Sequence, residues 1–236
     1  CMNESAATMN VPPSRAWTLF GVLAFVALIA SQAYAVLNSP ADKDMGHLQK
    51  ILYVHVPAAW TTFLAFMIVL VYSIRYMMRG QERDDLLAAA AAEVGAVFNG
   101  LTLILGMIWG KPAWGAWWVW EARLTSTLVL FMIFVGYLSL RAFVDDPERR
   151  AQWSAAVGAF GAINVPIVYM SVKWWRTIHQ LPSNASTMDS VYRVGLYTNA
   201  IAFVLIMIYF IRRRYELARL QRATELLADA AALGGA

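Results

Sequence analysis

Six apolar runs without a single charged residue constrain this chain more than any other feature of its sequence. They cover residues 16–36, 57–74, 94–109, 124–140, 153–172 and 194–211. Each is roughly as long as the ~20 helical residues that cross a bilayer, provided that the third helix begins near Leu86. Hydrophobic residues make up 60% of the chain and charged residues only 14%, a composition atypical of soluble domains. We predict an all-α, polytopic integral membrane protein with six transmembrane helices.

The same runs predict the organisation of the chain. We expect a cytoplasmic N-terminal segment (1–15), a single six-helix transmembrane domain (16–211) in contact with membrane lipids, and a cytoplasmic C-terminal tail (212–236) that begins as a helical extension. The first run is too long, and too poor in a small-residue cleavage site, for a removed signal peptide. The net charge of +4 is spread over the loops between the runs, which argues against binding to nucleic acid.

Positive charge predicts the orientation of these helices, because cytoplasmic loops are enriched in Lys and Arg. The N-terminus, the second and fourth loops and the tail hold 12 of the 19 cationic residues, including three consecutive arginines at 212–214. Both termini are therefore expected in the cytoplasm. The outer loops 39–56, 109–123 and 173–193 then share the opposite face.

This topology gathers aromatic and imidazole side chains at one membrane surface. The outer loops and adjoining helix ends contain all three histidines, His47, His55 and His179. They also contain eight of the ten tryptophans: Trp60, Trp109, Trp114, Trp117, Trp118, Trp120, Trp174 and Trp175. Trp17 and Trp153 are expected at the other interface.

The densest tryptophan segment reads WGKPAWGAWWVWEARLTS over residues 109–126, with five tryptophans in twelve residues. Gly110, Pro112 and Gly115 predict that its first half is not a regular helix. An interfacial belt needs only one or two indole rings per span, although that remains an alternative for Trp60, Trp174 and Trp175. The density favours an aromatic platform for a flat apolar ligand.

Two histidines flank this platform. His55 stands just before Pro57, in the expected first turn of the second span, and His179 lies in the last outer loop. A lone histidine is usually a hydrogen-bonded interface residue, but neutral imidazole is also an axial ligand of haem iron. A pair could hold haem from both faces. We interpret His47 as a bystander because iron has only two axial positions.

Competing chemistry is less well supported. Zinc would need three or four ligands, with Glu121 and Asp189 as candidates, yet no metalloprotease-like spacing exists. The single cysteine, Cys1, excludes a disulfide framework, a thiolate metal cluster and a C-x-x-C-H haem attachment motif. No hydrolytic or redox motif is present, so the chain is not expected to be an enzyme.

Charged residues near the platform suit the acidic groups of haem. Arg123, Lys111 and Lys50 are candidates to pair with the propionates, although contact with lipid headgroups is the alternative. Glu121 is expected to orient Arg123 or an indole N–H.

Polar residues inside the spans have other expected roles. Glu93 is expected to contact another membrane subunit, or to reach the cytoplasmic interface, rather than to transfer protons. Interhelical hydrogen bonds are expected from three asparagines, Asn99, Asn164 and Asn199. Gly158, Gly161 and Pro166 are expected to let the fifth span bend and pack closely.

Three motifs together identify a family. The tryptophan segment closely resembles the signature of haem-handling membrane proteins, and YVHVPAAW (53–60) and SVKWWRTIHQ (171–180) match the cytochrome c maturation protein C, or haem exporter protein C (CcmC), family. The resemblance extends from the first span to the sixth. One departure is Glu121, where the family usually has aspartate. Function is expected to survive this change.

The resemblance implies a protein of the bacterial inner membrane that holds haem at its periplasmic face as a b-type, non-covalently bound and transient cargo. The family's axial ligands fall on His55 and His179. Its platform falls on Trp114, Trp117, Trp118 and Trp120. The resemblance also implies delivery to a membrane-anchored periplasmic haem chaperone for c-type cytochrome biogenesis.

Further implied partners are an ABC-type ATPase, its membrane subunit and a small single-span protein, with ATP driving release of the loaded chaperone. The alternatives are a permease subunit that moves haem across the bilayer, a structural membrane subunit and an electron-transfer cytochrome. Against the permease, the sequence shows neither an inverted repeat nor a helix broken at mid-depth.

Overall fold

The computed structural model describes residues 14–179 and 188–234, and their regular structure is helical apart from one isolated bridge between Asp42 and Gly46. The helices are α2 (Arg15–Asn38), the 3-10 helix η2 (His47–Ile51), α3 (Leu52–Arg79), α4 (Glu82–Trp114), α5 (Ala122–Phe143), α6 (Pro147–Ala162), α7 (Asn164–Trp174) and α8 (Ser190–Gly234). They provide six segments long and apolar enough to span a membrane. The predicted six-span, all-α fold is confirmed. Most of the N-terminal segment 1–15, including Cys1, and residues 180–187 of the last outer loop lie outside the described residues.

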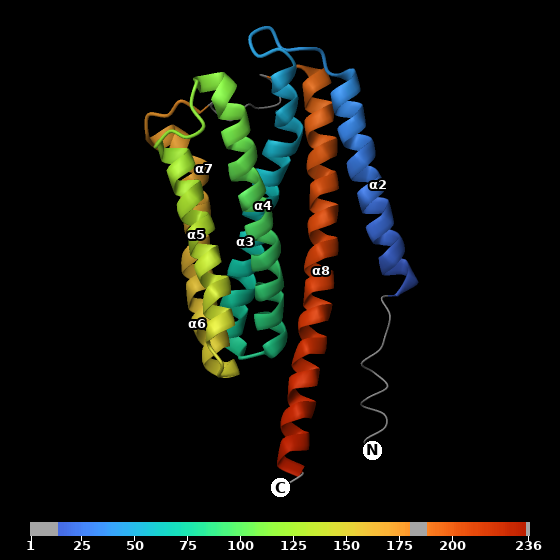
Figure 1. Ribbon diagram of the computed structural model, residues 1–236, viewed down its shortest axis with the longest axis vertical. Helices are drawn as coiled ribbons and strands as arrows, with labels where there is room; N and C mark the ends of the chain where they lie inside the picture. The colour runs from blue at the N-terminus through green and yellow to red at the C-terminus, as the bar shows by residue number, and fades with distance from the viewer. Residues whose placement is uncertain (1–13, 180–187, 235–236) are drawn as a thin grey trace.

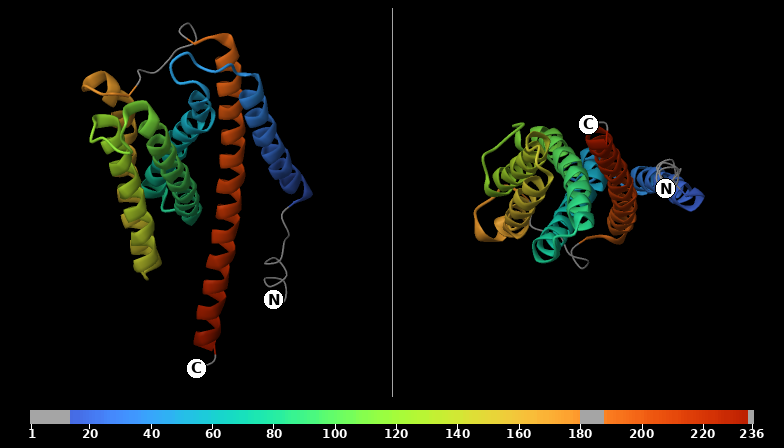
Figure 2. Two further views of the ribbon diagram at one scale, coloured as in Figure 1. Left: turned by 45° about the horizontal axis from the view of Figure 1, so that its top comes forward. Right: turned by 90° about the horizontal axis from the view of Figure 1, so that it is seen from below.

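The helices form an elongated bundle in which α3 and α4 are central (Figure 1). Seen from below, α5, α6 and α7 lie on one side, while α8 and then α2 lie on the other (Figure 2). The connections α2–α3 and α4–α5 and the segment after α7 meet at one end of the bundle, at the top of Figure 1. We call this the loop end. Helix α2 begins toward the opposite end, beyond which the C-terminal part of α8 extends (Figure 1).

Local sequence sets several helix ends. Gly80 and Gly115 adopt left-handed φ angles of 62° and 78° and terminate α3 and α4, as glycine commonly does at this position. The side chain of Asp146 accepts a hydrogen bond from the Arg149 backbone N–H at 2.7 Å, with Pro147 in the first turn of α6. These short turns place α3 beside α4 and α5 beside α6.

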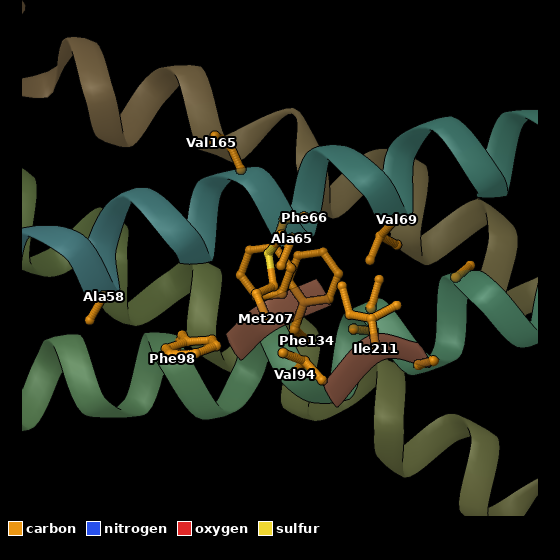
Figure 3. Close-up of a cluster of buried hydrophobic side chains, with 14 of the residues drawn as sticks. Ala58, Ala65, Phe66, Val69, Val94, Phe98, Phe134, Val165, Met207 and Ile211 are labelled. Carbon is orange, nitrogen blue, oxygen red and sulfur yellow. The ribbon is translucent and has the colours of Figure 1, made fainter. Parts of the chain in front are cut away.

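The core joins α3, α4, α5 and α8 around two stacked rings, Phe66 and Phe134, whose centroids are 3.6 Å apart (Figure 3). Small residues let the helices approach at this level. A Cβ on Gly95 of α4 would lie 2.6 Å from Cε1 of Phe66, so only glycine fits there. Close packing through small residues is the usual basis of helix association in membranes, where lipid removes the hydrophobic driving force.

The first half of the tryptophan segment is helical, contrary to prediction. Helix α4 continues through Gly110 and Pro112 to Trp114. Pro112 removes only the N–H that would bond to the Ile108 carbonyl, a small loss in the last turn. The chain leaves the helix only after Gly115 and bends until α5 begins at Ala122.

The fifth span is two helices, because α6 and α7 are interrupted at Ile163. Pro166 lacks the N–H that would bond to the Ala162 carbonyl. Ile163 keeps helical dihedral angles (φ −61°, ψ −26°), and Pro147–Trp174 remains one membrane-length segment. The bend of this span stays a prediction. A Cβ on Gly158 or Gly161 would lie 2.8 Å or 2.5 Å from a neighbouring side chain, as expected for close packing.

The carboxylate of Glu93 pairs with Arg214 of α8 within the same chain. Contact of Glu93 with another subunit stays a prediction. The two residues are 121 positions apart, so the pairing depends on how α4 and α8 pack.

Candidate functional site

A cavity of about 190 Å³ lies near the loop end, lined by residues of α3, α4, α5, α7 and α8 and of the segments around Trp118 and His179. Most of its lining is apolar or aromatic. It brings together five of the sequence-predicted site residues: His55, Trp114, Trp118, Arg123 and His179. These residues come from parts of the chain that are up to 124 positions apart.

His55 lies on a helix that begins earlier than predicted. Helix α3 starts at Leu52, so Pro57 stands inside the helix and leaves the Tyr53 carbonyl without its usual donor. The side-chain amide of Gln32 on α2 donates to this carbonyl at 3.0 Å. The Tyr53 carbonyl therefore keeps a hydrogen-bond donor despite Pro57. The same hydrogen bond joins α2 to the turn of α3 that carries His55.

The imidazole of His55 packs against α4 at Gly106. A Cβ on Gly106 would lie 3.3 Å from Cε1 and 4.0 Å from Nδ1 of His55, so this edge of the ring faces α4. His55 Nδ1 is buried and has no hydrogen-bond partner among the described residues. Gly106 thus provides the space in which the ring lies.

We expect Gly106→Ala to displace the His55 ring by a few tenths of an ångström. If His55 coordinates the metal of a bound cofactor or cargo, this shift should weaken binding of that molecule about tenfold. Changes to the residues that position a metal-coordinating side chain commonly have an effect of this size. Ligand retained through purification, measured by absorbance per protein, checks this. Gly136→Ala is the matched control, since a Cβ there meets nothing within 4 Å. Equal retention in both variants would contradict the prediction.

His179 follows α7 in the segment of residues 175–179, beside two perpendicular indoles. The centroids of Trp109 and Trp114 are 5.1 Å apart, and each ring lies 6.2–6.5 Å from the His179 imidazole. The backbone N–H of His179 donates to the Thr177 hydroxyl at 3.0 Å. That hydroxyl in turn donates to the Glu121 carboxylate.

Glu121 is the residue that joins the outer loops. It is buried, and its carboxylate caps α5 by accepting a hydrogen bond from the Leu124 backbone N–H at 2.5 Å, while also accepting from Thr177. The structure records no ion pair of Glu121 with Arg123, the role expected from the sequence. Glu121 instead fixes the start of α5 and, through Thr177, the backbone of His179.

We expect Glu121→Ala to cost about 1–2 kcal/mol of stability, since it removes an N-cap. It should also loosen the His179 segment, because Thr177 loses its acceptor. Thermal unfolding and limited proteolysis between α7 and α8 measure the two effects. Glu121→Asp should behave nearly as wild type, because aspartate is among the best N-cap residues. Wild-type proteolysis in Glu121→Ala would show that Glu121 does not hold this segment.

Arg123 supplies a cation to the cavity. Its Nη2 donates to the Tyr169 carbonyl of α7 at 3.1 Å, whereas its Nε is buried without a hydrogen-bond partner. A guanidinium with an unused donor in a cavity suits an anionic group of a ligand. Lys50 does not line the cavity, and its Nζ donates to the Val36 carbonyl at 2.6 Å.

The tryptophans divide into two groups. Trp114 and Trp118 line the cavity, and the buried indole Nε1 of Trp118 has no hydrogen-bond partner among the described residues. Trp117 and Trp120 are not part of the lining and remain 55% and 74% exposed. The two groups are in contact, because the rings of Trp118 and Trp120 meet edge to face with centroids 5.5 Å apart.

Sequence reasoning missed several lining residues. Trp109 and Trp60 line the cavity, and the density of the tryptophan segment could have indicated Trp109. Gly106 carried a weaker signal, a glycine inside an apolar span. Two of the three asparagines make the expected interhelical bonds: Asn164 donates to the Ser126 carbonyl and Asn199 to the Ser31 carbonyl. Asn99 makes none and lines the cavity instead.

Within residues 14–179 and 188–234, no group of three His, Cys, Asp or Glu side chains is placed to hold a metal ion. The polar side chains of the cavity are two imidazoles, several indoles, one guanidinium, the amide of Asn99 and the hydroxyls of Tyr169 and three threonines. Two imidazoles suit the two axial positions of haem iron, while the aromatic lining suits its flat apolar ring.

Comparison with known proteins gives consistent matches. The family model described as "Heme exporter protein C" (CcmC) matches residues 4–228. The chain is 39% identical to "Heme exporter protein C" of Bradyrhizobium diazoefficiens, over 78% of this chain and 72% of that protein. It is 36% identical to the Escherichia coli K12 protein of the same name, over 71% and 69%. A "Putative cytochrome c biosynthesis ccmC-like mitochondrial protein" of Marchantia polymorpha is 38% identical over 67% and 66%.

Proposed function

Because the chain belongs to the haem exporter protein C family, multi-pass membrane proteins that handle haem in cytochrome c maturation, we propose that its cavity holds haem between His55 and His179. The observation that carries this proposal is that both histidines, from distant parts of the chain, line one aromatic cavity at the loop end. Haem is the cargo here and is bound without a covalent bond.

Each group in the cavity has a role in this proposal. The two neutral imidazoles donate lone pairs to the iron from opposite faces of the ring. Trp114 and Trp118 contact the porphyrin, and Arg123 pairs with a propionate carboxylate. The protein supplies position and a dry environment, and no bond of the porphyrin is made or broken on this chain.

The site faces the periplasm in our proposal, and the protein resides in the bacterial inner membrane. The distribution of Lys and Arg supports this orientation, since the ends of the chain and the loops at the far end of the bundle carry most of the positive charge. Haem would then be presented where c-type cytochromes mature.

Delivery to a periplasmic, membrane-anchored haem chaperone is the second half of the proposed function. Trp117 and Trp120 support it, because two exposed indoles beside the cavity suit contact with a partner protein. The relatives named as exporters suggest that the chain assembles with an ABC-type ATPase, its membrane subunit and a small single-span protein. ATP hydrolysis in that complex would drive release of the loaded chaperone.

Absorption spectroscopy of the protein purified from membranes tests the proposal. We expect a low-spin, bis-imidazole haem spectrum, and transfer of that haem to an added haem-free chaperone domain on the outer side of sealed vesicles. A protein that neither retains nor takes up haem would overturn the proposal. Transport of haem across vesicles by this chain alone would support the permease alternative instead.

A further inference from the structure

Asn99 is the one asparagine of the spans whose amide is unsatisfied in the part of the chain that the structure describes. The residue has no exposed surface, and neither its Oδ1 nor its Nδ2 has a hydrogen-bond partner. It lines the same cavity as His55 and His179. A buried amide without partners costs free energy, so its place in a cavity calls for an explanation.

The packing of α3 against α4 places Asn99 at the inner end of the cavity. The two helices are antiparallel, with Gly106 facing His55 and Gly95 facing Phe66. Positions 99 and 62 therefore lie at one level, seven residues or about 10 Å inward from His55. A haem held by His55 would occupy the cavity that His55 and Asn99 both line.

The threonines that line the cavity are satisfied without a ligand. The hydroxyls of Thr62, Thr102 and Thr127 each donate to the backbone carbonyl four residues earlier, at 2.7–2.9 Å. The amide of Asn99 makes no such bond. Asn99 therefore differs from these threonines, because both the donor and the acceptor of its side chain need a partner. Water is the small molecule that can both donate to it and accept from it.

We propose that Asn99 binds water in the haem-free cavity, and that a bound porphyrin displaces this water without replacing its hydrogen bonds. The inference rests on the proposed function and adds a specific role to it. Apart from the propionates, for which the proposed function offers Arg123, the periphery of a porphyrin carries methine, methyl and vinyl groups, none of which can hydrogen-bond to an amide. Displacing a well-ordered water with such a group lowers affinity.

Asn99 thus makes the bound cargo releasable. A bis-imidazole site with an aromatic lining would otherwise hold haem tightly, which conflicts with delivery to a partner. One unsatisfied amide opposes binding without disturbing the iron ligands or the platform. In this account Asn99 is an affinity-determining residue and makes no contact with the iron.

Haem release from the full-length protein in lipid nanodiscs, with excess apomyoglobin as acceptor, tests this inference. We expect Asn99→Leu to slow release roughly tenfold, because an apolar side chain of similar size removes the unsatisfied group. The low-spin spectrum should stay unchanged. Ser139→Ala on α5 is the control outside the cavity, and it should release haem at the wild-type rate because its hydroxyl is bonded to the Val135 carbonyl within the helix.

Asn99→Thr is a second variant that guards against misfolding of the first. Its hydroxyl can bond to the Gly95 carbonyl four residues earlier, as Thr102 does to Phe98, so it too should slow release. Unchanged or faster release from both variants, with the spectrum intact, would overturn the role of Asn99 but leave the proposed function standing. Wild-type protein without haem would overturn both.

Discussion

Replacing either His55 or His179 with alanine is expected to abolish the low-spin haem spectrum and to weaken haem binding by more than about 100-fold. This loss exceeds the one expected when only a residue next to an iron-coordinating histidine is changed. Each substitution removes one of the two axial donors that the proposed site offers. The measurement is haem titration of the purified variants, followed by absorption spectroscopy and electron paramagnetic resonance. His47→Ala is the control, because His47 lies in η2 and does not line the cavity.

Rescue with free imidazole separates loss of a ligand from loss of structure. His55→Ala leaves space between α3 and Gly106 in which imidazole can bind, so added imidazole should restore the low-spin spectrum. Rescue is expected to be less complete for His179→Ala, because His179 lies on a loop segment rather than a helix. Full haem binding by the double variant would show that other residues hold the iron, and the proposed site would be wrong.

The membrane architecture could be predicted because its causes are local. An uncharged run of about 20 apolar residues crosses the bilayer as a helix, because lipid offers no hydrogen-bond partners for backbone N–H and C=O groups and a helix pairs them within the segment. The conformation around Pro112 could not be predicted with the same rule. Proline breaks helix interiors, but near a helix C-terminus it removes only one hydrogen bond, and Gly115 terminates the helix instead.

The candidate site was predictable in its parts but not in its arrangement. Topology alone placed His55 and His179 at one face, because odd-numbered loops of a six-span protein share a side. Which indoles line the cavity depends on the bend after Gly115, which no periodicity describes. The capping role of Glu121 did leave a signal, an acidic residue directly before the apolar run of α5. The unsatisfied amide of Asn99 left no signal in the sequence. An asparagine within an apolar run looks the same in the sequence whether or not its side chain is hydrogen-bonded in the folded protein.

The largest stability effect is expected at the far end of the bundle, at the ion pair of Asp85 and Arg141. Two hydrogen bonds of 2.5 and 2.9 Å join the guanidinium to the carboxylate, and the side chains are only 14% and 10% exposed. We expect Asp85→Asn to cost about 3–5 kcal/mol, because it leaves a buried guanidinium without its counter-charge. Thermal or denaturant unfolding in detergent measures the loss. The exposed pair of Arg222 and Glu82 is the control, and breaking it should cost less than about 1 kcal/mol.

The double variant Asp85→Leu/Arg141→Met tells whether the pair stabilises the bundle or is only costly to break. Removing both charges leaves no unpaired ion, so most of the lost stability should return. The reversed pair, Asp85→Arg/Arg141→Asp, should not recover it. Asp85 lies in the first turn of α4, where the helix dipole favours a negative charge, and Arg141 lies over the ring of Tyr137 at 5.9 Å. If the protein with the reversed pair were as stable as wild type, the dipole of α4 and the ring of Tyr137 would not favour the native placement of the two charges.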